Sequence, residues 1–433
     1  MTAWVPDTRS AAPCRACATP LGEPALDLGP QPLLDDPVAP SVAPSIPLVP
    51  VRIVLCPSCG LAQLAAVPRP AVSDPAVAAT LAASRHGHGR RRPGASTIHL
   101  VGWAGQVLAQ TRLPAGSLVV DVASGDGAAL HPYAAAGMAV LGHEQYADLA
   151  EAANADGLRT IGDALGSPAS TAQIASRGGA GLVLLNHAMA HVDDLEAVAT
   201  RVREALAPGG WVAIETLDFG TILRRGLFDV VGHAHRSYFS MASLASLLAG
   251  QGLAIVAAQR DPVHGGTLRV LARADGPAGV AQRSLDRLMA ADERIGVTDP
   301  SALGRLGDRA ALVGERLHEH LASAARSGTS VVGYGAPGRA VSILSLARVN
   351  AGLLPFTVDR DASKHGLALP GSGVPVCPVE ALDAARPQEV LVLAWTWARE
   401  IAEELSRVGD WGGRLVTPMP RLRTLDRPNG GRG

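Results

Sequence analysis

Residues 118–127 read Leu-Val-Val-Asp-Val-Ala-Ser-Gly-Asp-Gly, an apolar run that passes into a turn of small residues. The run predicts a buried strand at Leu118–Val122, followed by a tight turn and a helix. Small residues let a ligand approach the backbone, and ligands of doubly wound sheets bind beyond the carboxyl ends of the strands. A ligand-free strand-turn-helix is the alternative. The candidate cofactor-binding residues in this turn are Asp121, Ala123, Ser124, Gly125, Asp126 and Gly127.

The next strand indicates what kind of cofactor the turn would hold. It ends at Glu144, about 20 residues further on, where a carboxylate can accept both ribose hydroxyls of a nucleoside. The turn lacks the three-glycine pattern of pyrophosphate sites, which favours a nucleoside without phosphates, such as S-adenosylmethionine. Asp163, after the third predicted strand, is a candidate contact for the adenine edge.

Four cysteines precede this segment as two Cys-x-x-Cys pairs, Cys14 with Cys17 and Cys56 with Cys59. Such pairs can place four thiolates in a tetrahedron around one Zn²⁺. Residues 1–75 form too small a unit to fold by burial alone, so a metal would stabilise them. The gap between the pairs is longer than the usual zinc-ribbon spacing, and two disulfides or four buried thiols are the alternatives.

The pattern of the remaining chain predicts two α/β regions. Helical stretches alternate with short apolar strands such as Trp211–Glu215 between residues 97 and 275, which predicts a parallel sheet covered on both faces. A helical stretch from 281 to 326, interrupted near Pro300, leads into a second strand-glycine-helix unit at 330–339. We therefore expect three domains, at residues 1–75, 76–275 and 276–433.

Composition excludes some function classes. The 433 residues carry a formal net charge of −1, which argues against a nucleic-acid or membrane partner recruited by bulk electrostatics. The first 30 residues lack a signal-peptide pattern, and no long uncharged apolar stretch predicts a membrane span. We expect a cytoplasmic location, where thiols bind metal more often than they cross-link.

Histidines gather in three short segments, at residues 186–191, 232–235 and 264–269. The first segment follows a predicted strand and so lies at the carboxyl edge of the sheet. Histidine is the side chain best matched to proton transfer near neutral pH, which indicates acid–base chemistry. A hydrogen-bonded structural role is the alternative for each member of the group: His187, His191, His233, His235 and His264.

Taken together, the motifs resemble the sugar C-methyltransferases of antibiotic biosynthesis, which methylate nucleotide-linked deoxy-keto-sugars. The resemblance covers almost the whole chain, and it implies an α/β fold with three parts. These are an N-terminal zinc-binding domain, a doubly wound S-adenosylmethionine-dependent methyltransferase domain and a C-terminal Rossmann-like domain that binds the nucleotide sugar. The matching segments are Cys14–Cys17, Cys56–Leu64, Asp121–Gly127, His264–Arg269, Tyr334–Ala336, Asp359–Arg360 and Leu393–Trp395.

The resemblance also implies roles for particular residues. Asn186 and His191 match a strand-end motif, with Asn186 as a further cofactor-binding residue. His235 would remove the proton beside the ketone, and His191 would donate to the enolate oxygen; His233 is the third catalytic candidate. The implied cofactors are S-adenosylmethionine and Zn²⁺. The candidate substrate-binding residues are His264, Arg269, Tyr334, Arg339 and Asp359.

One departure leaves the function open. Where the family reads Tyr-His-Glu-His, this chain reads Gly232-His233-Ala234-His235. The leading hypothesis is C-methylation next to the ketone of a nucleotide-linked keto-deoxysugar by a monomer without nucleic-acid or membrane partners. A methyltransferase with another acceptor and a non-catalytic protein that binds S-adenosylmethionine are the alternatives. A zinc-ribbon nucleic-acid binder is disfavoured, since basic residues cluster only at Arg90–Arg92.

Overall fold

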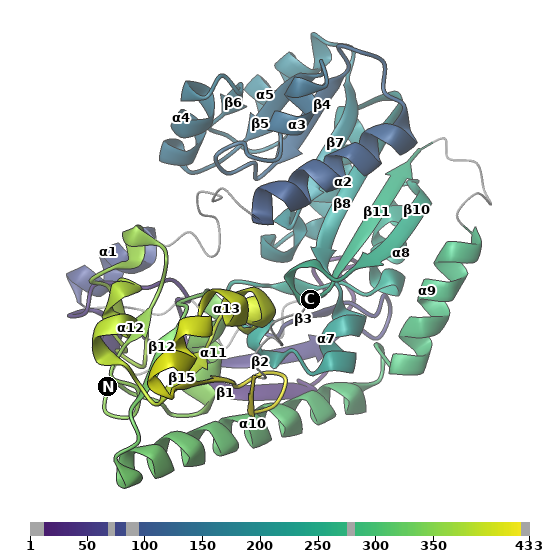
Figure 1. The fold of residues 1–433 in the computed structure, drawn as a ribbon. Coiled ribbons are helices and arrows are strands. Elements are labelled where there is room, and N and C mark those ends of the chain that lie inside the picture. Colours follow the sequence, from purple (N-terminus) through teal and green to yellow (C-terminus); the bar gives the residue numbers. More distant parts are fainter. Residues whose placement is uncertain (1–12, 68–73, 84–94, 275–281, 426–433) are drawn as a thin grey trace, which may run out of the picture.

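The computed structural model describes residues 13–67, 74–83, 95–274 and 282–425, and the run Arg90–Arg92 lies outside them. Within these residues the strands form three sheets, with the long helix α10 (Pro300–Ser327) along one side of the molecule (Figure 1). None of the described helices is long and apolar enough to cross a bilayer.

The central sheet has the strand order β10-β11-β8-β7-β4-β5-β6. Its strands are β4 (Leu118–Val122), β5 (Ala139–His143), β6 (Thr160–Ile161), β7 (Ala180–Asn186), β8 (Leu206–Leu217), β10 (Ala254–Asp261) and β11 (Thr267–Arg273). The predicted strand at Leu118–Val122 is confirmed. The prediction of a wholly parallel sheet is wrong, because β11 runs antiparallel to both β8 and β10. The turn between β10 and β11 is too short to hold the crossover that a parallel pair needs.

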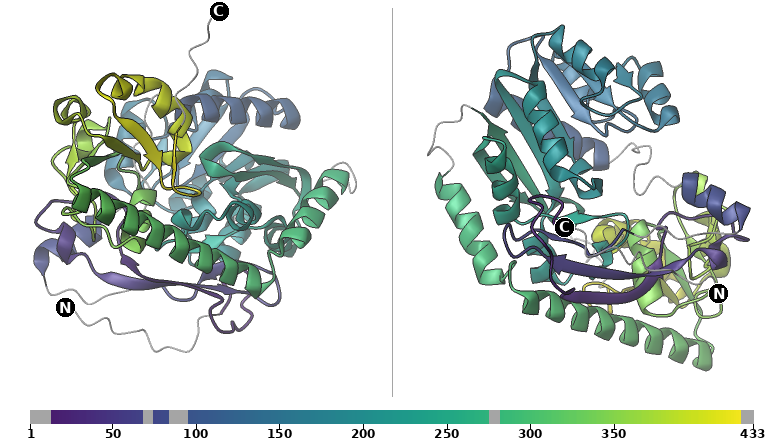
Figure 2. Two further views of the ribbon diagram at one scale, coloured as in Figure 1. Left: turned by 60° about the horizontal axis from the view of Figure 1, so that its bottom comes forward. Right: turned by 180° about the vertical axis from the view of Figure 1, so that it is seen from behind.

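Helices cover both faces of this sheet, as predicted (Figure 2). They are α2 (Ala95–Thr111), α3 (His131–Ala135), α4 (Ala147–Ala155), α5 (Pro168–Ala175), α6 (Leu195–Ala205) and α8 (Met241–Gly250). Helix α7 (Phe219–Arg225) instead packs against the N-terminal sheet and the long helix α10. Strand β4 pairs with β5 on one side and β7 on the other, so the chain reverses its direction of winding there. The crevice at this switch point lies beyond the carboxyl ends of β4 and β7.

The cysteine-bearing segment forms a four-stranded sheet with a strand from the central region. The sheet has the order β1-β2-β3-β9 and contains β1 (Leu26–Pro32), β2 (Leu48–Leu55), β3 (Ala62–Leu64) and β9 (Ser237–Tyr238). Strand β9 begins two residues after His235, and Ala62 pairs with Tyr238. The segment that carries the catalytic histidine candidates is therefore held against the cysteine region by backbone hydrogen bonds.

The C-terminal sheet has the order β14-β13-β12-β15-β16-β17 and is parallel except at β17. Its strands are β12 (Val331–Tyr334), β13 (Thr357–Val358), β14 (Val376–Cys377), β15 (Glu389–Val392), β16 (Arg414–Thr417) and β17 (Arg423–Thr424). The remaining helices are α1 (Pro75–Ala83), α9 (Gln282–Ile295), α11 (Gly338–Leu346), α12 (Glu380–Ala385) and α13 (Ala398–Glu404).

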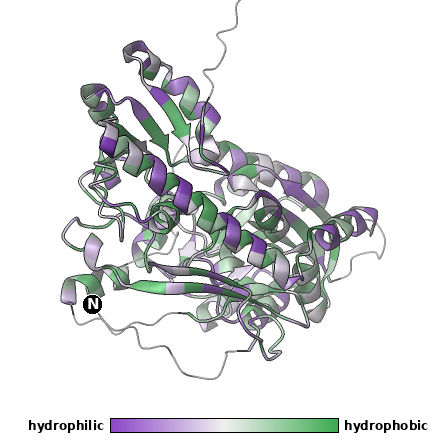
Figure 3. Ribbon diagram, turned by 90° about the horizontal axis from the view of Figure 1, so that it is seen from below, coloured by the Kyte–Doolittle hydropathy of each residue, from purple (hydrophilic) through white to green (hydrophobic). Residues whose placement is uncertain are grey.

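The predicted interruption near Pro300 separates α9 from α10. The Asp299 side chain caps α10 by accepting the backbone N–H of Ser301, and Pro300 occupies the first turn, where its missing N–H costs nothing. Helix α10 is amphipathic, and Figure 3 shows hydrophilic and hydrophobic residues alternating along it. Its apolar residues, such as Leu306 and Leu317, pack in one core with Val51 of β2 and Leu344 of α11. This core joins the N-terminal and C-terminal sheets.

Candidate active site

The turn after β4 has the backbone conformation that the small residues predicted. Ala123, Gly125 and Gly127 have φ angles of 57°, 59° and 80°, in the left-handed region. A Cβ on Gly127 would lie 2.6 Å from Cδ1 of Leu158, so only glycine fits there. Ala123 has a side chain and is held in this unfavourable region, which marks the turn as a candidate ligand site.

A cavity of about 320 Å³ opens beyond this turn, and its lining includes Ala123, Glu144, Asp163 and His191. Glu144 is 1% exposed, and its carboxylate accepts the backbone N–H groups of Gly125 at 2.8 Å and Tyr146 at 2.9 Å. A carboxylate has about four acceptor sites, so Glu144 retains capacity for ribose hydroxyls. Asp163 is exposed, and the Ser167 hydroxyl lowers the pKa of its carboxyl.

Further polar residues lie close to the turn after β4 and could contact the expected nucleoside. Asn186 ends β7 and is 6% exposed, and its Oδ1 has no hydrogen-bond partner among the described residues. An orphaned acceptor at the switch point suits the ammonium group of a methionine moiety. Asp121 and Ser124 are buried under the turn, and Asp126 accepts the N–H of Ala128 at 3.3 Å within it. The residues present therefore fit S-adenosylmethionine.

His191 and His235 form a pair of imidazoles beside this cavity. Their ring centroids are 5.1 Å apart. Nδ1 of His191 lies 2.6 Å from the carbonyl oxygen of Ala234, and Nδ1 of His235 lies 3.0 Å from that of Val230. A carbonyl only accepts, so each Nδ1 donates and each neutral ring keeps its lone pair on Nε2. A neutral His235 ring in this tautomer can accept a proton at Nε2. The neutral His191 ring is also an acceptor, and it becomes the donor that the sequence suggested only when it is protonated.

His233 lies apart from this pair. It is 8% exposed, and its Nε2 donates to the carbonyl oxygen of Val49 in β2, at 3.1 Å. The contact joins the loop of residues 232–235 to the N-terminal sheet and uses one ring nitrogen for that purpose.

A second group of polar side chains surrounds Glu215, which ends the predicted strand Trp211–Glu215 and is 1% exposed. Its Oε1 lies 2.7 Å from Nε2 of His99 and 3.0 Å from Nε2 of His187, and its Oε2 accepts Nε–H of Arg269 at 2.8 Å. Burial alone would raise the pKa of Glu215, but the hydrogen bonds from His187 and His99 outweigh it and lower that pKa well below its usual range. His264 stacks edge-on against both imidazoles at 5.3 Å.

This Glu215 group has metal-ligating atoms close together, since His99, Glu215 and His264 each offer one within 4.8 Å of the others. The hydrogen bonds argue against a cation. Arg269 donates to Nδ1 of His99 at 2.8 Å, so the proton of the neutral ring is on Nε2 and points at Glu215. The group is satisfied as a hydrogen-bond network. Burial and the neighbouring His187 lower the pKa of His264 to about 3, so its imidazole is neutral.

A cavity of about 690 Å³ lies between the central and C-terminal regions. His264 and Arg269 line it, together with Trp395, Trp397 and Arg399. The other candidate substrate-binding residues lie elsewhere. Arg339 donates to the carbonyl oxygen of His264 and lies 3.8 Å from Asp229.

Tyr334 and Asp359 are used inside the C-terminal region. The hydroxyl of Tyr334, 3% exposed, donates to Glu404 at 3.1 Å. Asp359 accepts the backbone N–H of Ala336 at 2.7 Å, and Lys364 donates to the carbonyl oxygen of Ala336 at 2.6 Å. These contacts hold the turn after β12 in place.

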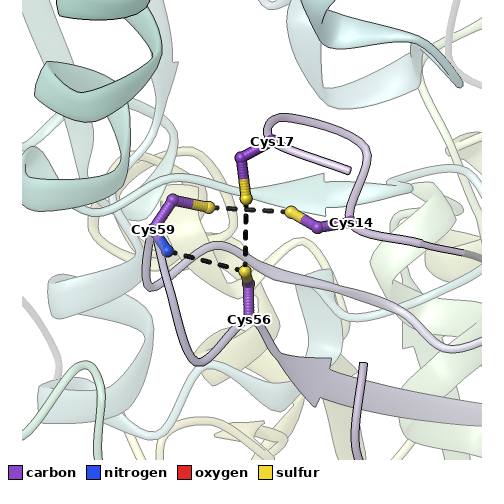
Figure 4. Close-up of side chains that lie close together, drawn as sticks. All are labelled: Cys14, Cys17, Cys56 and Cys59. Carbon is purple, nitrogen blue, oxygen red and sulfur yellow. Dashed lines mark hydrogen bonds between the residues drawn. The ribbon is translucent and has the colours of Figure 1, made fainter. Parts of the chain in front are cut away.

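The four N-terminal cysteines converge as predicted (Figure 4). The sulfur atoms of Cys14 and Cys59 are 3.6 Å apart, and those of Cys17 and Cys56 are 3.5 Å apart. A disulfide needs about 2.05 Å, whereas thiolates about 2.3 Å from one tetrahedral Zn²⁺ lie about 3.8 Å from each other. The disulfide alternative is thus excluded in this structure. Four thiolates would hold the metal without an open position for catalysis.

Comparisons with known proteins agree with these sites. Residues 14–73 match a family model described as “Putative zinc binding domain”, residues 101–258 match “Methyltransferase domain”, and residues 262–420 match “C-methyltransferase C-terminal domain”. The chain is 30% identical over 311 residues to the C-methyltransferase NovU of Streptomyces niveus, which covers 72% of this chain and 74% of NovU. The chain belongs to the C-methyltransferase family. It is an S-adenosylmethionine-dependent methyltransferase, and it carries the family's zinc-binding domain.

Solved structures resemble this C-methyltransferase more distantly. An S-adenosylmethionine-dependent methyltransferase from Clostridium acetobutylicum has a TM-score of 0.32 and 11% identity, and covers 41% of this chain and 91% of its own. Magnesium protoporphyrin IX methyltransferase from Synechocystis, solved with bound SAH, has a TM-score of 0.34 and 12% identity, and covers 43% of this chain and 90% of its own. At these scores the likeness adds nothing to the family match.

Sequence reasoning missed two polar residues of this C-methyltransferase. Glu215 was assigned only as the end of a strand, and His99 only as part of a helix. An acidic residue that ends an otherwise apolar strand, like Glu144, was the available signal for Glu215. His99 gave no comparable signal, because it reaches the site through the way in which α2 packs on the sheet.

Proposed function

We propose that this methyltransferase transfers a methyl group to the carbon beside the ketone of a nucleotide-linked keto-deoxysugar. The observation that carries the proposal is the imidazole pair of His191 and His235 beside the cofactor cavity. An acceptor carbon next to a ketone is acidic enough to lose its proton to a positioned base. We assign that proton transfer to Nε2 of His235.

The residues on the donor side have positioning roles in this proposal. S-adenosylmethionine, when bound, supplies an electrophilic methyl group on a cationic sulfur. Glu144 would accept the ribose hydroxyls, and Asn186 would face the methionine ammonium. Holding both reactants in one orientation removes most of the entropic cost of their encounter.

The chemistry of the 690 Å³ cavity supports a nucleotide-linked acceptor. Trp397 is 38% exposed beside it and offers a stacking face for a base. Arg225, Arg399 and Arg423 also line the cavity, and guanidinium groups suit a diphosphate. In this proposal residues 1–75 hold zinc, 76–275 bind the methyl donor and 276–433 bind the nucleotide portion.

The test supplies the purified chain with a thymidine-diphosphate-linked 4-keto-deoxysugar and a methyl-labelled donor. We expect labelled product from the wild type and a loss of about 10²–10⁴-fold in His235→Asn, with donor affinity unchanged. His131→Asn is the matched control, because this imidazole is exposed on α3 and bonds only Asp156. An unchanged rate in His235→Asn would refute the base assignment, and donor binding without transfer to any keto-sugar would refute the acceptor class.

A further inference from the structure

A small cavity of about 60 Å³ lies where all three regions of the chain meet. Asp35 lines it from the N-terminal region, His233 and His235 line it from the central loop, and Arg339 lines it from the start of α11. A space of this size holds a few water molecules, so polar groups around it lie within reach of one small ligand group. The predicted base therefore shares a cavity with a carboxyl from a distant part of the sequence.

Proton removal beside a ketone leaves negative charge on the ketone oxygen, which calls for a hydrogen-bond donor. The loop does not supply one in its neutral state. The neutral rings of His191 and His235 keep their lone pairs on Nε2, and His233 already donates to Val49. Residues 232 and 234 are glycine and alanine and carry no polar side chain.

Asp35 has the features of a carboxyl that keeps its proton. Its Oδ1 is buried and has no hydrogen-bond partner among the described residues. Its Oδ2 lies against the backbone of Gly338, where a Cβ would come within 2.8 Å of it. Glycine at this first position of α11 is what allows the carboxyl to stand there.

No cationic side chain forms an ion pair with Asp35 among the described residues. The other buried carboxyl of the cavity, Asp229, accepts Nε1–H of Trp395 at 2.7 Å and lies 3.8 Å from Arg339. The guanidinium of Arg339 thus forms an ion pair with Asp229 but no hydrogen bond to it, and its Nη1 has no hydrogen-bond partner among the described residues. Burial and the neighbouring Asp36 raise the pKa of Asp35 to about 7, and a hydrogen bond from the backbone of Asp35 itself acts in the opposite direction. The positive end of α11 also favours the ionised carboxyl, and so would the loop imidazoles if they were protonated.

We propose that Asp35, in its protonated form, donates a hydrogen bond to the ketone oxygen of the acceptor while His235 removes the neighbouring proton. The C–H electron pair moves into a C=C bond, and the C=O pair moves onto the oxygen that Asp35 holds. The new C–C bond would form as the methyl–sulfur bond of the donor breaks and its electron pair stays on sulfur, which leaves a neutral thioether; the C=O bond is restored and Asp35 still carries its proton. The abstracted proton stays on His235 and passes to water. The inference rests on the proposed function.

The experiment follows proton removal alone, as exchange of solvent deuterium into the keto-sugar in the presence of S-adenosylhomocysteine. Asp35→Ala removes the donor and should slow exchange about 10²–10³-fold. Asp35→Asn keeps a hydrogen-bond donor but cannot ionise. It should retain much of the rate and lose the decline that the wild type shows as the pH rises through about 7. Asp36→Asn is the control, since its exposed carboxyl lies outside the cavity.

The outcomes separate the two proposals. Exchange in the wild type with an equal rate in Asp35→Ala overturns the role of Asp35 and leaves the proposed function standing. If the exchange rate of Asp35→Asn still declines above neutral pH, the role of Asp35 is overturned as well. Absence of both exchange and methyl transfer in the wild type overturns the proposed function, and the Asp35 inference with it. Zinc content and unfolding midpoint, measured on every variant, show that each one is folded.

Discussion

Raising the pH should weaken the folded chain through Asp35, and Asp35→Asn should remove that effect. The folded state raises the pKa of this carboxyl from 3.8 to about 7, so it binds more protons than the unfolded state between these values. The contribution of such a group to the unfolding free energy is fully present below its pKa in the unfolded state. It is lost as the pH rises through its pKa in the folded state.

The size of the effect follows from the shift. About three pKa units correspond to about 4 kcal/mol of unfolding free energy. About 2.5 kcal/mol of this falls between about pH 5 and pH 8, because the unfolded carboxyl is already mostly ionised at the lower value. Asn has nearly the same volume as Asp and does not titrate, so the variant lacks this contribution.

Urea unfolding of the wild type and Asp35→Asn across this range measures the prediction. The free energy of the variant relative to the wild type should rise by about 2.5 kcal/mol from about pH 5 to pH 8. Asp36→Asn keeps the titrating carboxyl and should decline nearly as the wild type does, with a slightly smaller drop because Asp36 contributes to the raised pKa. A decline of equal size in Asp35→Asn would show that Asp35 does not hold its proton, and the reasoning would fail.

Three further predictions concern the other sites. Cys56→Ser should abolish stoichiometric zinc binding and lower the urea midpoint, whereas Cys377→Ser should retain the metal. Atomic absorption measures the zinc content of both variants. A full zinc content in Cys56→Ser would contradict the four-thiolate site. Glu215→Gln removes one of the two carboxylates that pair with the buried guanidinium of Arg269, which keeps Asp261, and should cost about 1.5–3 kcal/mol in urea unfolding. A change under about 1 kcal/mol would mean that the network is dispensable. Glu144→Gln should weaken S-adenosylmethionine binding about tenfold or more in calorimetry. The exposed Glu151→Gln should bind normally, and equal affinity in both would remove Glu144 from the ribose site.

Local patterns identified the parts of the structure that short segments control. Cys-x-x-Cys spacing predicted the thiolate cluster, since each pair closes its own turn. The run at Leu118–Val122 and the small residues after it predicted the cofactor turn, because backbone conformation there depends on side-chain size. Pro300 predicted the break between α9 and α10 for the same local reason.

Pairings between distant segments could not be predicted in this way. The prediction of a parallel sheet was wrong at β11, because a short turn and not a crossover follows β10. The pairing of β9 with β3 brings the histidine loop to the cysteine region, and no spacing in the sequence signals it. Asp35 lies in a proline-rich stretch whose composition favours loops and edge strands over helices and does not single out this carboxyl.

The sequence by itself determined the cysteine cluster, the tight turn after β4 and the alternation of strands and helices, since each depends mainly on residues close together in the chain. Only the tertiary structure decided which proton donors and acceptors meet. The tautomers of His191 and His235 are set by the carbonyl groups of Ala234 and Val230, and the raised pKa of Asp35 comes mainly from its burial where the three regions of the chain meet. Burial and hydrogen bonding control these properties, and both arise only when segments far apart in the sequence pack together.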